Sequence, residues 1–168
     1  EAHDALTRQL SLLVAAADEC GYDILIFGDY AIAAAGDAVF PNSALAEAGW
    51  MATRTVGNMV YPDLPASRAF AMVDHEIAHV YIPNAADIPP VADLFRALDG
   101  VDEVLDAKAQ QAVGVDHPNS GELLLLAEQG RWFAYPWWTR HTQQPDYATH
   151  VDIHNKPGFD PCELVGDW

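Results

Sequence analysis

Apolar positions divide the chain into segments of helical and of strand character. Between residues 3 and 20 they recur at helical spacing, at Leu6, Leu10, Leu13, Val14 and Ala17. Gly21 then supplies a residue type that ends helices in the left-handed conformation. Residues 22–27 are mostly apolar, with β-branched and aromatic members. This pattern predicts a strand covered on both faces, so the chain opens with a helix that feeds a strand of an α/β sheet.

The middle of the chain repeats both patterns over shorter segments. They predict helices over residues 42–48 and 89–98, and strands over residues 50–56, 68–74, 78–82 and 101–105. Asn42 or Ser43 is expected to cap the first of these helices, and Gly49 to end it. Residues 57–67 are predicted to form a loop. His75-Glu76 separates two strands, although a single bent strand is an equally good interpretation.

Residues 122–127 and 132–135 predict a β-hairpin, because four turn-forming residues separate two apolar runs. Regular periodicity is lost after Trp137-Trp138, and no internal repeat or linker is visible. We therefore expect a single α/β domain over residues 1–168. Its predicted architecture is a layered domain with a mainly parallel sheet flanked by helices and an appended β-hairpin region.

The charge of the chain narrows the classes of partner. Among its 168 residues, 25 are acidic and 8 are basic, which gives a net charge of −17. Such a chain is a poor ligand for phosphate backbones and anionic lipids, so neither a nucleic acid polymer nor a membrane is expected as a partner. No apolar stretch is long enough to span a bilayer. We interpret the charge as an aid to solubility rather than as a halophilic trait. The oligomeric state is left undefined.

The two cysteines and the first residues bear on the compartment. Cys20 and Cys162 are far apart, which excludes a CxxC pair and leaves a disulfide between them open. No basic and apolar signal peptide is visible, so the expected compartment is the cytoplasm by default. Because the chain starts at Glu1 rather than Met, secretion stays open as an alternative.

Residues 152–161 concentrate candidate metal ligands. Asp152 and His154 lie two residues apart in a segment that also contains Pro157-Gly158. A carboxylate and an imidazole at this spacing can bind one cation, and the Pro-Gly pair is typical of a turn that holds them. The alternative interpretation is a solvated turn histidine that is bonded locally.

A second group of candidates is Asp74, His75 and His79. On a helix the two histidines share a face at metal-ligand spacing, but the surrounding residues favour a strand. Strand geometry places them roughly 13 Å apart, which is too far for one ion unless the chain bends. A stand-alone metal module at this position is therefore the weakest functional hypothesis.

Two further groups have mainly structural interpretations. Residues 116–121 (DHPNSG) have the composition of a turn, and His117 is not expected to be a ligand. The aromatic residues between 132 and 138 are expected to pack on the core rather than to stack bases. The chain contains no nucleophile elbow, phosphate-binding loop, dinucleotide fingerprint or HExxH pair.

Four stretches in a common order resemble a known family. They are Gly28–Ala31, Ala78–Ile82, His117–Glu128 and His154–Pro161. Together they resemble the C-terminal half of the type I phosphodiesterase and nucleotide pyrophosphatase family, within the alkaline phosphatase superfamily. The resemblance implies an alkaline phosphatase-like fold, a small phosphorylated substrate, and two divalent cations, commonly zinc, that polarise the phosphoryl group.

The resemblance also implies roles for individual residues. Asp29 falls where the family has the Asp of a Ser-Asp-His-Gly turn, a metal ligand, and His154 falls at a late His ligand of the other cation. Asp152 has no role assigned by the resemblance, and its position two residues before His154 leads us to expect a direct ligand or a support of His154. Tyr30 replaces the histidine of that turn, and a neutral phenol is a poor zinc ligand. The family's nucleophile and remaining ligands precede the matched part.

Two functional hypotheses follow. In the first, the chain is the C-terminal portion of a metal-dependent phosphoester or pyrophosphate hydrolase, with at most partial metal sites of its own. In the second, it is a non-catalytic α/β binding or interaction domain that retains the fold, and Tyr30 marks the lost metal centre.

Overall fold

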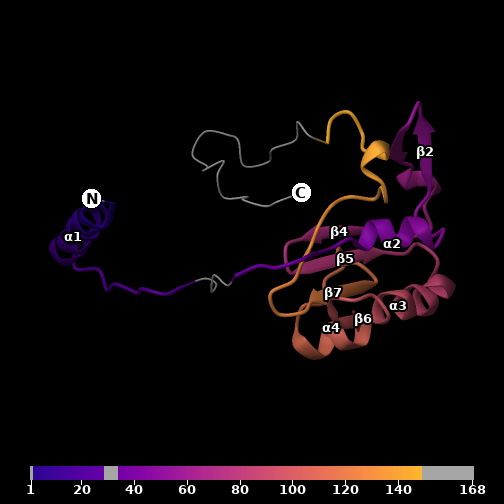
Figure 1. Ribbon diagram of the computed structural model, residues 1–168. Coiled ribbons are helices and arrows are strands. Elements are labelled where there is room, and N and C mark those ends of the chain that lie inside the picture. The colour runs from indigo at the N-terminus through magenta and orange to yellow at the C-terminus, as the bar shows by residue number, and fades with distance from the viewer. Residues whose placement is uncertain (1, 29–33, 149–168) are drawn as a thin grey trace. The chain divides into compact units, whose positions relative to one another are not determined.

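The computed structural model describes residues 2–28 and 34–148 and divides the chain into two compact units, 1–33 and 34–168 (Figure 1). The first unit contains the helix α1 (Ala2–Cys20), which confirms the predicted helix. Gly21 ends it with φ +71°, and the backbone N–H of Tyr22 donates to the Ala17 carbonyl at 2.9 Å. Within the described ranges, no helix is both long and apolar enough to cross a membrane.

The predicted strand over residues 22–27 is wrong. These residues are irregular in the structure, and Leu25, Ile26 and Phe27 are 76–85% exposed. A strand exists only when its N–H and C=O groups pair with a neighbouring strand, and none of the described strands pairs with this segment. The apolar pattern alone did not establish that a partner would be present.

The second unit is built around a four-stranded sheet. Its order is β4 (Phe70–Asp74), β5 (Ile77–Tyr81), β7 (Leu123–Ala127) and β6 (Val101–Asp106). The α/β class is confirmed, but the prediction of a mainly parallel sheet is wrong, because all three neighbouring pairs are antiparallel. For β4 and β5 the two-residue connection forces this orientation, since parallel neighbours need a long crossover.

A separate parallel pair joins β1 (Ala38–Val39) to β8 (Trp132–Phe133). The predicted hairpin of residues 122–127 and 132–135 is therefore wrong: β8 pairs with β1 and not with β7. The physical reason is that β7 is hydrogen-bonded to β5 on one edge and to β6 on the other, so it has no free edge for a third neighbour.

The turn at His75-Glu76 confirms the two-strand interpretation of residues 68–82. Asp74 pairs with Ile77, and His75 has φ +53°, the left-handed conformation that two-residue hairpin turns require.

The predicted loop over residues 57–67 instead contains a second hairpin. β2 (Thr53–Val56) pairs with β3 (Met59–Pro62) around Gly57-Asn58, and a 3₁₀ turn over Leu64–Ala66 follows. β2 is shorter than the predicted strand 50–56. The N–H groups of Trp50 and Met51 bond to the Leu45 carbonyl, and thus complete the preceding helix end.

Two helices cover one face of the main sheet. α2 (Pro41–Glu47) contacts β4, and α3 (Ile88–Arg96) contacts β6 and β7 (Figure 1). The predicted helix 89–98 is thus confirmed, with 3₁₀ turns nearby at Ala85–Asp87 and later at His141–Gln143. The core between helices and sheet contains the buried side chains of Leu45, Ala71, Val73, Ala78, Val80, Val91, Phe95, Leu123 and Leu125.

Buried polar side chains tie this unit together. Asn42 does not cap α2. Its amide instead bonds both the N–H and the carbonyl of Ala71 at 2.8 Å, so it occupies the outer edge of β4 as a neighbouring strand would. The guanidinium of Arg68 donates two hydrogen bonds to the buried Asp87 and lies 4.3 Å from the centre of the Trp50 ring.

The helix α4 (Ala107–Val113) is absent from the pattern-based predictions. Asp106 caps it by accepting from the Ala109 N–H at 2.8 Å, and Gly114 ends it with φ +75°. Both signals stand in the sequence. They were missed because the helix contains only alanines and one valine as apolar residues, which makes a weak periodic pattern.

Candidate functional site

The predicted metal ligands Asp29, Asp152 and His154 lie outside the described residues, as does Tyr30. Whether they converge in one cleft therefore stays a prediction. The other candidate groups lie within the described residues, so the structure shows whether any of them forms a metal or binding site.

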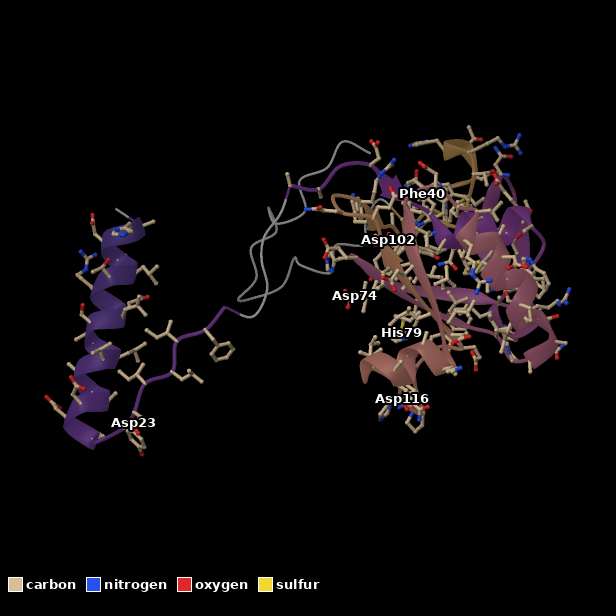
Figure 2. The ribbon with its side chains drawn as sticks, turned by 90° about the horizontal axis from the view of Figure 1, so that it is seen from below. Asp23, Phe40, Asp74, His79, Asp102 and Asp116 are labelled. Carbon is tan, nitrogen blue, oxygen red and sulfur yellow. The ribbon has the colours of Figure 1, made fainter. Side chains whose placement is uncertain are left out.

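Asp74, His75 and His79 do not form a shared metal site. The His75 Nδ1 lies 2.9 Å from the Asp74 Oδ1, and both side chains are exposed at the tip of the β4–β5 hairpin. His79 lies further along β5, away from Asp74 (Figure 2), and its Nδ1 accepts a hydrogen bond from the Gly121 N–H at 3.2 Å. In the described part of the chain, no group of three or more His, Cys, Asp or Glu side chains could hold a metal ion.

The segment 116–121 is a hydrogen-bonded turn, as predicted. The His117 Nδ1 accepts from the Asn119 N–H at 3.1 Å, and the His117 carbonyl accepts from the Ser120 N–H at 2.8 Å. The Ser120 hydroxyl donates to the Val115 carbonyl at 3.3 Å. His117 therefore stabilises its own turn.

Most of the aromatic residues between 132 and 138 pack on the unit, which confirms the structural interpretation for them, whereas Tyr135 is 57% exposed. Phe133 is buried, and the indole N–H groups of Trp132 and Trp137 donate to the carbonyls of Gly36 and Val60 at 3.1 and 2.9 Å. The Trp137 and Trp138 rings meet edge to face with centroids 5.2 Å apart. Each buried aromatic thus has a structural partner.

Two tyrosines extend this aromatic group. Tyr147 lies with its ring centroid 6.1 Å from that of Tyr61 and 6.5 Å from that of Trp137. The Tyr61 hydroxyl donates to Asp146 at 2.9 Å, and this bond raises the pKa of Tyr61 above its usual value. Partial burial, followed by the charge of Asp146, raises the pKa of Tyr147. No local pattern links Tyr61 to residues so far along the chain, so sequence reasoning did not find this contact.

The described residues therefore form a scaffold with a satisfied aromatic cluster and no metal centre of their own. Asp29, Asp152 and His154 stay the predicted metal ligands, and they lie outside the described residues. Carboxylate oxygens and imidazole nitrogens are donor types that zinc accepts.

The family model described as type I phosphodiesterase / nucleotide pyrophosphatase matches residues 2–160. Among solved structures, phosphonoacetate hydrolase from Sinorhizobium meliloti 1021 in complex with phosphonoacetate is 16% identical, with a TM-score of 0.45, over 61% of this chain and 24% of that one. The same enzyme in complex with phosphonoformate is 19% identical, with a TM-score of 0.38, over 46% and 22%.

The chain thus spans about a quarter of the length of the hydrolase structures that it matches. No curated protein matches it. Because the family model covers nearly the whole chain, this protein belongs to the type I phosphodiesterase / nucleotide pyrophosphatase family.

Proposed function

We propose that this chain is part of a metal-dependent phosphoester or pyrophosphate hydrolase of the phosphodiesterase or nucleotide pyrophosphatase type. The observation that carries the proposal is the family match over residues 2–160, which includes both segments that contain the candidate ligands. The expected substrate is a small phosphorylated molecule.

In this proposal Asp29 and His154 each bind a divalent cation, zinc in the first instance, and Asp152 binds or orients His154. A bound cation would stabilise the negative charge on the phosphoryl oxygens. Asp29 and His154 are single ligands of two different sites, so each site needs further ligands from the remainder of a longer hydrolase. The isolated chain is therefore expected to bind metal weakly and not to turn over substrate.

The test is calorimetric titration of zinc and of manganese into the chelator-treated full chain. Replacement of His154 by Ala should abolish the site-specific part of the heat. His3→Ala is the matched control, because it also removes one imidazole but from an exposed position on α1, and it should leave the heat unchanged. Equal loss in both variants would indicate only non-specific binding to histidines.

A second candidate function is a non-catalytic binding domain, and Tyr30 favours it. By family resemblance this tyrosine takes the place of a histidine ligand, and a neutral phenol binds zinc poorly. If the tyrosine alone lowers the metal affinity of this chain, Tyr30→His should raise the zinc affinity measured in the same titration. Absence of binding in both the natural chain and this variant, with intact folding, would favour the non-catalytic domain.

A further inference from the structure

The segment 119–122 is docked against β5 beyond the end of β7. The Tyr81 hydroxyl donates to the Asn119 carbonyl at 3.0 Å, and the Ile82 N–H donates to the Glu122 Oε2 at 2.7 Å. The Gly121 N–H donates to the His79 Nδ1 at 3.2 Å. Three side chains thus replace the ladder bonds that a longer β7 would make with β5.

Gly121 is the closest point of this contact. A Cβ built at residue 121 would lie 2.6 Å from both the N and the O of Val80, so only glycine allows the two backbones to approach in this way. From the other side, the buried Gln110 of α4 donates to the Gly121 carbonyl at 3.1 Å. Gly121 is therefore held on its N–H by His79 and on its carbonyl by Gln110.

The bond from Gly121 requires a specific state of the imidazole. A nitrogen that accepts a hydrogen bond carries no proton, so His79 must be neutral with its proton on Nε2. In the imidazolium both ring nitrogens are donors, and Nδ1–H would then point at the N–H of Gly121. Protonation therefore both removes the bond and places two donors against each other.

We propose that His79 is a pH-sensitive latch that holds the segment 119–122 on β5 when neutral and releases it when protonated. This inference is independent of the proposed hydrolase function. It predicts a local opening at acidic pH, confined to the segment before β7, while the core beneath stays closed.

Most of the charged residues on the strands and segments next to His79 are acidic. The titratable or charged residues on its sheet face and on the neighbouring segments include Asp74, His75, Glu76, Tyr81, Asp102, Glu103, Asp106, Lys108, Asp116, His117 and Glu122. The strand neighbours directly opposite, Met72 and Leu124, carry no charge. The Gly121 bond requires an unprotonated Nδ1, so the protonation state of His79 is linked to whether the segment is held.

The experiment is amide hydrogen exchange on the full chain, corrected for the intrinsic pH dependence of exchange, from about pH 8 to about pH 5, the interval in which imidazoles titrate. The protection of the Gly121 amide should fall roughly three- to tenfold over this interval, as expected for loss of one hydrogen bond. In His79→Asn, whose Oδ1 takes the place of Nδ1 but does not titrate, protection should be independent of pH. The same fall in both proteins would overturn the proposal.

A second measurement on the unaltered chain keeps the proposal testable if the variant does not fold. The ¹⁵N chemical shifts of the neutral His79 ring report which nitrogen carries the proton. A proton on Nε2, and a Gly121 amide shift that titrates together with the ring, would support the latch. A proton on Nδ1 would overturn it.

Discussion

Residues 2–28 and 34–148 contain similar apolar patterns, but the apolar side chains are exposed in the first range and largely buried in the second. Leu13 on α1 is 67% exposed and Leu25 is 82% exposed, whereas Leu125 on β7 is fully buried. α1 has no buried side chain at all, while the second unit contains one contiguous core. The difference shows that an apolar stripe is enough to define a helix, but burial requires a second layer that the stripe itself does not provide.

The largest expected difference in the free energy of unfolding comes from the same Leu→Ala substitution made once in each region. Leu125→Ala should destabilise the second unit by about 3 kcal/mol, because it removes buried methyl groups and leaves a cavity. Leu13→Ala should change stability by less than about 0.5 kcal/mol, because its side chain is exposed. Urea unfolding followed by tryptophan fluorescence and circular dichroism checks both. A similar loss in the two variants would show that α1 is covered in solution.

The same substitution at two glycines, Gly121 and Gly28, tests whether the backbone is closely packed in the second unit and unpacked in the first. Gly121→Ala should cost about 2 kcal/mol, because the new Cβ collides with the Val80 backbone. Gly28→Ala has no atom within 4 Å of its new Cβ, so it should be neutral or slightly stabilising. Thermal unfolding of both variants is the measurement. A neutral Gly121→Ala would contradict the close approach of the two backbones.

Helix-end chemistry provides a smaller effect. Asp106→Ala should destabilise α4 by about 1 kcal/mol, because the Ala109 N–H loses its capping partner. Ser11→Ala in α1 should instead leave helicity unchanged or slightly increased, since the Ser11 hydroxyl only bonds back to the Thr7 carbonyl. Amide exchange at Ala109 checks the first effect and circular dichroism the second. An unchanged Ala109 amide in Asp106→Ala would count against the cap.

The smallest effect is a pH dependence in the alkaline range. The pKa values of Tyr61 and Tyr147 are raised, chiefly by the hydrogen bond to Asp146 for the first and by partial burial for the second. The neutral phenols therefore contribute stability that is present below the usual tyrosine pKa and is lost as pH rises through the raised values. Asp146→Asn should lower the Tyr61 pKa in an ultraviolet titration. Identical titration curves would exclude the contact with Asp146.

Much of the secondary structure could be predicted from local signals, and the failures share one cause. α3 and β6 were predicted correctly, because each has its own periodic pattern and turn residues at its ends. The strand over residues 22–27 and the hairpin over 122–135 failed, because both predictions assumed a strand partner. Pairing depends on which edges are free in the assembled sheet, and this is not a local property.

Around the candidate groups, too, local contacts could be predicted from the sequence and contacts between distant residues could not. The turn role of His117 follows from Asp, Asn and Ser beside it, so composition was sufficient. The bond from Gly121 to His79 joins residues 42 positions apart, and the contact of Tyr61 with Asp146 joins residues 85 positions apart. No spacing rule predicts such contacts, because the distance along the chain does not determine the distance in space.

The sequence by itself determined the family, through the order of its motifs, and the approximate bounds of α1, α2 and α3, through glycines and apolar periodicity. Motifs and helix bounds both depend on residues that are close together in the chain, so they can be recognised without the tertiary structure. Only the tertiary structure decided the antiparallel order of the main sheet, the parallel pair of β1 with β8, and the bond from Gly121 to His79. These depend on which backbone groups are left unpaired once the layers have assembled, and every buried N–H and C=O must then find a partner.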